Sequence, residues 1–199
     1  MNILDIKNCT ICYQNGTPAV SDVSLSVSEG EIVSIVGESG SGKTTLIRAV
    51  LGLLPPGGKI TGGEILFDGM DLTDPGRVLD SYPFELSGGM KQRVGIAMGM
   101  TAKPKLLLAD EPTSALDVTI QAQVVHQMKE LRDKYGVTII LVTHNMGVAS
   151  YLSDKIGVMC RSRMVEFGTR DEIIYHPKES YTKELLEAVP KLGGERFAK

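Results

Sequence analysis

The stretch Gly37-Glu38-Ser39-Gly40-Ser41-Gly42-Lys43-Thr44-Thr45 satisfies the phosphate-loop pattern G-x-x-x-x-G-K-[ST] at every fixed position. An apolar run from Glu31 to Val36 precedes it and is typical of a buried strand, and the segment from Thr44 to Leu53 is typical of a helix. Strand, loop and helix therefore stand in the order that phosphate binding requires. The sequence predicts a nucleotide triphosphate site at this stretch, rather than an ordinary glycine turn.

The residue types of this phosphate loop, Gly37 to Thr45, suit a triphosphate. Its glycines allow backbone conformations that a Cβ would obstruct, so that successive N–H groups can turn toward a β-phosphate at a helix N-terminus. Lys43 would bridge the β- and γ-phosphates, and the Thr44 hydroxyl would bind Mg²⁺.

Length and charge exclude several classes of function. With 199 residues the chain can form one substantial domain, and 21 basic against 24 acidic residues give a net charge of −3. Nothing in this balance indicates nucleic acid as a partner. No apolar run approaches the roughly 18 residues that span a bilayer, and Met1 to Asp5 lacks the basic flank of a signal peptide. We expect a cytoplasmic protein that docks on a membrane protein.

Three cysteines leave an odd count. Cys9 and Cys12 form a C-x-x-C pair, but if Leu4 to Tyr13 is a strand, residues three apart point to opposite faces. We therefore expect free thiols, with a zinc or redox site as the alternative.

The first thirty residues predict an antiparallel β layer. Strands from Leu4 to Tyr13 and from Ala19 to Val27 flank the turn Gln14-Asn15-Gly16. Tyr13 is a candidate to stack on an adenine ring, although an aromatic residue on a strand is often ordinary core.

A second potential anion site follows a long loop region. Leu86-Ser87-Gly88-Gly89-Met90 precedes a predicted helix from Lys91 to Ala102, and free N–H groups and the helix dipole point outward at such a start. The alternative is a simple helix cap.

Two further strands end in polar residues. The strand from Lys105 to Glu111 ends in two carboxylates, of which Asp110 suits a role beside Mg²⁺ and Glu111 is placed to polarise a water. The strand from Val137 to Val142 delivers Thr143-His144 to its carboxyl end, and a histidine can hydrogen-bond a γ-phosphate oxygen.

The remaining elements are expected around these strands. A helix from Val118 to Tyr135 ends at Gly136, and His126 and His176 are expected at the surface. The last predicted elements are a helix at Asn145–Leu152, strands at Lys155–Cys160 and Met164–Phe167, and helices at Asp171–His176 and Tyr181–Val189.

Taken together, these residues resemble the ATPase subunit of an ABC transporter. The resemblance implies an α/β P-loop NTPase core of ABC type with an N-terminal antiparallel β layer. It implies that the phosphate loop is the Walker A motif, that Lys43 and Glu111 are catalytic, that His144 is the switch histidine, and that Tyr13 is the adenine-stacking aromatic. The other matching motifs are Leu86–Gly89 as signature, Leu106–Glu111 as Walker B and Ser114–Asp117 as D-loop.

A closer resemblance lies in two stretches, from Ser114 to Gln123 and from His176 to Pro190. They are similar to the ATPases of dipeptide, oligopeptide and nickel importers.

The chain departs from the family between two of its motifs. Lys43 and Ser87 are 44 positions apart, whereas the family usually has about twice that spacing, enough for a glutamine loop and a helical subdomain. No glutamine occurs between Gln14 and Gln92, and the change from Leu72-Thr73 to Asp74-Pro75-Gly76-Arg77-Val78-Leu79 looks like a join across a missing segment. The helical subdomain is expected to be truncated, which bears on Mg²⁺ coordination and on coupling to the membrane subunit.

We expect one ABC-type domain with five parts: a β layer and first core strand (1–36), the loop, helix and β segment (37–72), the join (73–86), the signature helix, Walker B and switch (87–168), and C-terminal helices (169–199).

The resemblance implies a subunit that binds ATP and Mg²⁺ and powers an importer of peptides or nickel from the inner face of the cell membrane. Its partners would be transmembrane permease subunits, a second ATPase subunit and, indirectly, a substrate-binding protein. In the pair, Ser87, Gly88 and Gly89 of one copy would close on ATP held by the other. The alternative is an ATP-binding interaction module with little hydrolysis. A chromosome-maintenance or translation ATPase is a third reading.

Overall fold

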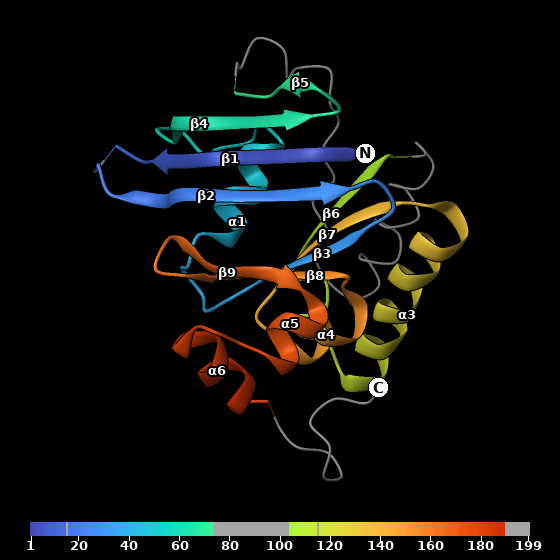
Figure 1. The fold of residues 1–199 in the computed structure, drawn as a ribbon. Helices are drawn as coiled ribbons and strands as arrows, with labels where there is room; N and C mark the ends of the chain where they lie inside the picture. Colours follow the sequence, from blue (N-terminus) through green and yellow to red (C-terminus); the bar gives the residue numbers. More distant parts are fainter. Residues whose placement is uncertain (15, 74–103, 115, 190–199) are drawn as a thin grey trace.

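Two β-sheets organise the chain in the computed structural model, which describes residues 1–14, 16–73, 104–114 and 116–189 (Figure 1). The first sheet is antiparallel, with strand order β2-β1-β4-β5. It consists of β1 (Asn2–Cys12), β2 (Pro18–Ser28), β4 (Lys59–Phe67) and β5 (Met70–Asp71). The expected N-terminal antiparallel layer is confirmed.

The second sheet has the order β6-β7-β3-β8-β9, in which β9 alone runs antiparallel to its neighbour. Its strands are β3 (Ile32–Val36), β6 (Leu106–Asp110), β7 (Thr138–Thr143), β8 (Lys155–Cys160) and β9 (Arg163–Thr169). Every residue of β3 and β7 is buried, as expected for central parallel strands covered on both faces. Strand β3 lies between β7 and β8, so the loop that follows it opens at the centre of the sheet.

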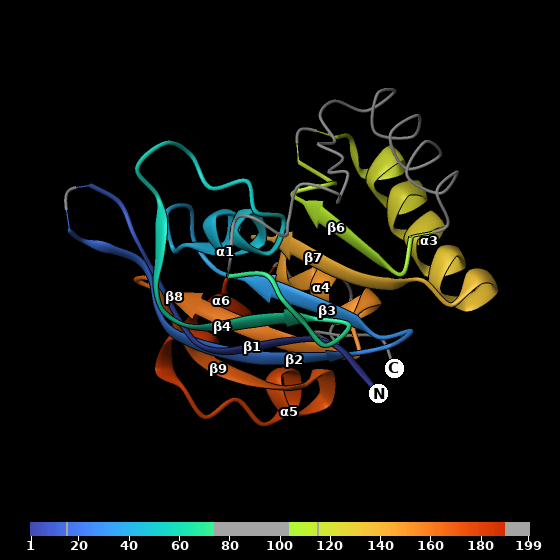
Figure 2. The ribbon, with the colours of Figure 1, turned by 90° about the horizontal axis from the view of Figure 1, so that it is seen from above.

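Helix α1 (Lys43–Val50) lies between the two sheets (Figure 2). Its buried side chains pack with those of β1 and β2 on one side and of β3 and β7 on the other. The helix ends before the predicted Leu53, because Gly52 adopts a left-handed conformation with φ of 67°.

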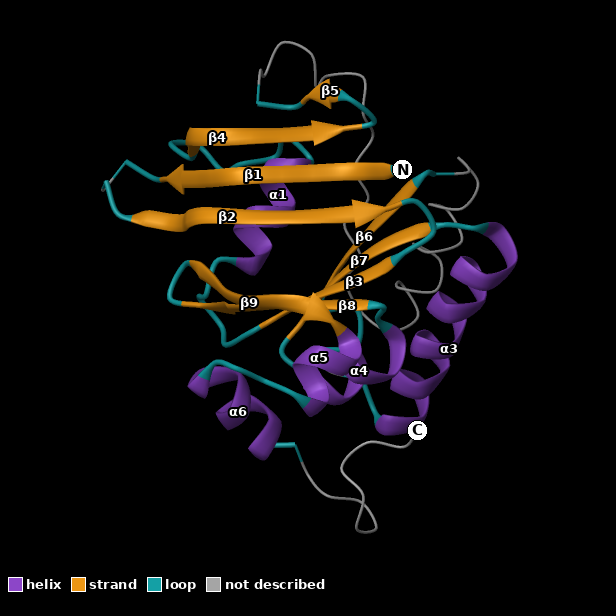
Figure 3. Cartoon of the chain, viewed as in Figure 1, coloured by secondary structure: helices purple, strands orange, loops and turns teal. Residues whose placement is uncertain are grey.

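Helices α3 (Val118–Tyr135) and α4 (Met146–Leu152) cover the other face of the parallel sheet, where Val124 and Leu152 join the apolar cluster around Ile139 (Figure 3). Helices α5 (Arg170–Tyr175) and α6 (Ser180–Glu187) pack with β8 and with the end of β3.

Local sequence signals set the ends of two of these helices. The Asp117 side chain accepts a hydrogen bond from the Ile120 N–H at the start of α3, and Gly136 ends that helix with φ of 66°. Asn145 caps α4 through hydrogen bonds from the N–H groups of Gly147 and Val148.

The cysteines of β1 follow the predicted alternation, since Cys9 is buried and Cys12 is partly exposed, and both are free thiols. His126 and His176 are exposed, as predicted. Residues 74–86 of the join, the signature residues Ser87, Gly88 and Gly89 and the helix predicted after them lie outside the described residues. No helix in the part of the chain that the structure describes is both long and apolar enough to cross a bilayer.

Candidate active site

The carboxyl ends of three neighbouring parallel strands form the site. Strand β3 ends at Val36 and continues into the phosphate loop, β6 ends at Asp110, and β7 ends at Thr143. Val36 pairs with Thr143, and Asp110 pairs with Val142. This register brings Glu111 and His144, each one residue past its strand, to the same edge as the phosphate loop.

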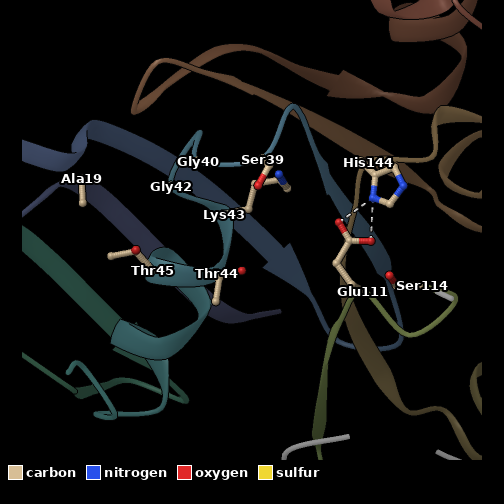
Figure 4. Close-up of a pocket in the computed structure, with 10 residues that line it drawn as sticks. All are labelled: Ala19, Ser39, Gly40, Gly42, Lys43, Thr44, Thr45, Glu111, Ser114 and His144. Carbon is tan, nitrogen blue, oxygen red and sulfur yellow. Dashed lines mark hydrogen bonds and ion pairs between the residues drawn. The ribbon is translucent and has the colours of Figure 1, made fainter. Parts of the chain in front are cut away.

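A cavity of about 460 Å³ opens at this edge (Figure 4). Glu111 and His144 lie across it from the loop residues Thr44 and Thr45. The residues that line it are Ala19, Ser39, Gly40, Gly42, Lys43, Thr44, Thr45, Glu111, Ser114 and His144. Tyr13 does not line this cavity, and its ring lies beside Gly58, where an added Cβ would be 2.9 Å from Tyr13 Cε1.

Close backbone contacts explain two glycines of the loop. An added Cβ on Gly37 would lie 2.1 Å from the Met159 carbonyl oxygen of β8, and one on Gly42 would lie 2.3 Å from the Ala19 carbonyl oxygen of β2. Both glycines also have positive φ, 150° and 102°. Each sheet thus touches the loop at one of these glycines, and no larger residue fits at either position.

Lys43 points into the loop and is only 6% exposed. Its Nζ donates hydrogen bonds to the carbonyl oxygens of Gly37 and Glu38, both at 2.8 Å, and to Ser41 Oγ at 3.4 Å. Burial lowers the pKa of Lys43 from its usual 10.5, and the carboxylates of Glu111 and Asp110 oppose that shift. A buried ammonium that donates to backbone oxygens is placed to donate to phosphate oxygens instead, and those bonds are stronger because the phosphate is charged.

Two oxygen ligands of the kind that Mg²⁺ prefers lie next to each other. Thr44 Oγ1 donates a hydrogen bond to Asp110 Oδ1 at 3.1 Å. Among the described residues, no group of three His, Cys, Asp or Glu side chains could hold a metal. This arrangement fits Mg²⁺, which is usually held by one or two protein groups together with phosphates and waters.

Glu111 has a strained backbone, with φ of 48° in the left-handed region. Its N–H donates to the Val142 carbonyl oxygen at 2.8 Å, and its own carbonyl oxygen accepts from the Ser114 N–H at 3.0 Å. These bonds fix the backbone of Glu111, and its side chain points toward His144, whose Nδ1 is 2.9 Å from the Glu111 carboxylate (Figure 4). A carboxylate and an imidazole in contact beside a phosphate site can share the handling of a water proton.

The role of Ala19 could not be predicted from the sequence. It contacts Gly42 through its backbone carbonyl oxygen, which every residue type has. Ser114 was predicted only as part of a motif and lines the cavity. The three signature residues lie outside the described residues.

Comparison with known proteins identifies the family. The family model of the ABC transporter matches residues 20–79 and 73–114. Dipeptide transport ATP-binding protein DppD of Bacillus subtilis (strain 168) is 35% identical over 96% of this chain and 77% of its own length. Oligopeptide transport ATP-binding protein OppF of Streptococcus mutans serotype c is 35% identical over 95% of this chain and 82% of its own length.

Solved structures share the fold. CbiO1 from Clostridium perfringens, part of the ABC transporter complex cbiONQ, superimposes with a TM-score of 0.74 at 24% identity, over 94% of each chain. The ATP-binding cassette MJ0796, in a dimeric post-hydrolysis state bound to ADP and Pi, has a TM-score of 0.70 at 25% identity, over 84% of this chain and 98% of its own. The chain therefore belongs to the ABC transporter family, as one of its ATP-binding subunits, which are ATPases.

Proposed function

We propose that this chain hydrolyses ATP to power the import of dipeptides or oligopeptides through an ABC transporter. The observation that carries this proposal is the meeting of the phosphate loop, Glu111 and His144 at the ends of three adjacent strands. The relatives support the substrate class, because they are named for dipeptide and oligopeptide transport. Their names give no support to nickel, the other substrate class that the sequence suggests.

ATP would bind with its β- and γ-phosphates inside the phosphate loop, Gly37, Glu38, Ser39, Gly40, Ser41, Gly42, Lys43, Thr44 and Thr45. Backbone N–H groups of the loop would surround the phosphate oxygens. Lys43 would exchange the carbonyl oxygens of Gly37 and Glu38, now at 2.8 Å, for phosphate oxygens, which carry more negative charge. Tyr13 would contact the adenine only if the β1–β2 hairpin brought its ring toward the cavity.

Thr44 and Asp110 would hold Mg²⁺, since their oxygens already lie 3.1 Å apart. When bound, Mg²⁺ supplies positive charge that offsets the charge on the β- and γ-phosphates.

Glu111 would accept a proton from the water that attacks the γ-phosphorus, while the bond to the leaving oxygen of ADP breaks. His144 would hydrogen-bond a γ-phosphate oxygen. Lys43 would stabilise the charge that develops on the leaving oxygen.

The proposed partners are a second ATPase subunit, permease subunits in the membrane and, through them, a substrate-binding protein. The dimeric state of MJ0796 supports the first partner. In such a pair, Ser87, Gly88 and Gly89 of one copy would face the phosphate loop of the other. The chain would then work peripherally on the inner face of the cell membrane.

Alignment lengths support the shortened segment. The alignment to DppD runs over 259 positions, whereas this chain has 199 residues, so at least 60 aligned positions have no counterpart in it. The two matches to the family model overlap at residues 73–79. We infer that residues 73–86 stand where the relatives have a longer segment. The parts 1–36 and 37–72 precede this join, and the parts 87–168 and 169–199 follow it.

The sequence also suggests a second candidate function, an ATP-binding interaction module with little hydrolysis, and the names of the relatives give it no support. The deciding experiment measures phosphate release by the chain alone and in proteoliposomes with dipeptide permease subunits, binding protein and dipeptide, beside the Glu111→Gln variant. Turnover that rises in the complete system and is lost in Glu111→Gln supports the importer function. Equally low turnover in both settings, with ATP still bound, would establish the module instead.

A further inference from the structure

The C-terminal helix α6 makes a direct contact with the phosphate loop. The backbone N–H of Glu38 donates a hydrogen bond to the Tyr181 hydroxyl oxygen at 3.1 Å, across 143 residues of sequence. Tyr181 is the second residue of α6. Neither the loop pattern nor the family motifs account for this bond.

The bond acts on a peptide group that Lys43 also holds. The carbonyl oxygen of Gly37 accepts from Lys43 Nζ at 2.8 Å, and the N–H of the same peptide, that of Glu38, donates to Tyr181. Gly37 also lies close to the Met159 carbonyl oxygen, so two hydrogen bonds and one close backbone contact constrain the entry to the loop. If Lys43 donates to phosphate oxygens instead, its hydrogen bond to the Gly37 carbonyl oxygen is lost, whereas the hydrogen bond from the Glu38 N–H to Tyr181 remains.

The position of Tyr181 is itself well fixed. Thr182 is fully buried, and Leu186 is 4% exposed in the apolar cluster that contains Val36, the last residue before the loop. The turn before α6 is tied to β9, because the Glu166 carboxylate accepts from the N–H groups of Lys178 and Glu179 at 2.8 and 3.3 Å. Burial is the main cause that raises the pKa of Tyr181 above 10.0, so its phenol stays neutral at physiological pH.

We propose that Tyr181 is a positioning residue for ATP binding: its hydroxyl holds the Gly37–Glu38 peptide in the conformation that lets the phosphate loop receive ATP. This inference rests on the proposed ATP site. It also makes α6 a place from which the C-terminal part of the chain can change ATP affinity, and by linkage ATP binding would stabilise α6 in return.

The test compares Tyr181→Phe, which removes one oxygen and keeps the ring, with Tyr175→Phe, the same change on half-exposed Tyr175 of α5. ATP dissociation constants, KM and kcat for hydrolysis, and thermal unfolding are measured on the full chain. For Tyr181→Phe we expect the ATP dissociation constant and KM to rise about two- to tenfold, the range for the loss of one neutral hydrogen bond. We expect kcat at saturating ATP to stay unchanged. Tyr175→Phe should match the parent chain in every measurement.

Three results would overturn the proposal. Equal ATP affinity in Tyr181→Phe and the parent chain would show that the hydroxyl does not position the loop, while the ATP site itself stands. A lower unfolding temperature with a lower kcat and unchanged KM would show a purely structural role. Failure of the parent chain to bind ATP would remove both this proposal and the proposed function.

Discussion

His144 Nδ1 lies 2.9 Å from the carboxylate of Glu111, although the two residues are 33 positions apart and follow different strands. Strands β6 and β7 create this pair by ending side by side, with the backbone of Glu111 bonded to β7 through Val142. The two side chains proposed to handle the attacking water and the γ-phosphate are therefore linked to each other, and changing one alters the surroundings of the other.

This link predicts non-additive kinetics. Glu111→Gln and His144→Ala should each lower kcat by about 10² to 10⁴-fold, the usual range for a group that transfers or positions a proton, with ATP binding retained. The double variant should lose far less than the product of the two single losses, because the residues act as a unit. Steady-state hydrolysis of the four chains measures this, and multiplicative losses would show that the two act independently.

Replacing Lys43 is predicted to weaken ATP binding without lowering the stability of the ATP-free chain. Burial lowers its pKa, so the folded chain releases the Lys43 proton at lower pH than the unfolded chain, and the charged form costs stability at neutral pH. Lys43→Met should weaken ATP binding by about 10- to 100-fold, the loss of a charge-assisted bond.

The same variant should not lower the unfolding temperature measured without ATP, and it should lose most of the rise that ATP produces. Lys183→Met, at an exposed position of α6, is the control and should keep that rise. A large drop in the unfolding temperature of Lys43→Met without ATP would show that the buried ammonium stabilises the fold, contrary to this expectation.

The glycine contacts predict which substitutions the loop rejects. Gly37→Ala and Gly42→Ala place a Cβ at 2.1 and 2.3 Å from backbone oxygens, whereas Gly69→Ala, also at positive φ, meets nothing within 4 Å. Relative to Gly69→Ala, each loop variant should lose a further 1–3 kcal/mol, approximately the cost of overpacking, and should bind ATP poorly. Denaturant unfolding and ATP titration measure both effects, and equal stability of the three variants would mean that only backbone conformation matters.

Cys9 predicts a pH dependence of stability. Burial raises the pKa of its thiol from 9.0 to about 11, so unfolding releases a proton between these values and the free energy of unfolding should fall as pH rises from 9 to 11. Cys9→Ala should flatten that fall after correction for its own stability loss.

In the native chain a thiol reagent should label the partly exposed Cys12 and Cys160 and spare Cys9. Fast labelling of Cys9 would show that the antiparallel sheet opens readily around β1.

The elements with local signals could be predicted from the sequence. The sequence predicts α3 from Val118 to Tyr135 with Gly136 at its end, and the structure confirms both bounds and adds the Asp117 cap at the start. The phosphate loop follows a strand and starts a helix, as its pattern requires. Helix α1 was predicted too long, since an apolar run continued past the left-handed Gly52.

Contacts between distant segments could not be predicted. The Ala19 carbonyl oxygen against Gly42 and the Tyr181 hydroxyl on the Glu38 N–H depend on how sheets and helices pack, and no spacing or residue pattern records them. The pairing of Glu111 with His144 is an intermediate case. The sequence predicts Glu111 and His144 each at the carboxyl end of a strand, but it does not indicate that β6 and β7 are direct neighbours.

The measurement that tests the central claim most directly is ATP binding and hydrolysis by the purified chain beside Glu111→Gln. The proposed site predicts that the parent chain binds ATP with Mg²⁺ and turns it over, and that Glu111→Gln binds ATP equally well with its turnover lost. Failure of both chains to bind ATP, or undiminished turnover in Glu111→Gln, would contradict an ATPase site formed by the phosphate loop, Asp110, Glu111 and His144.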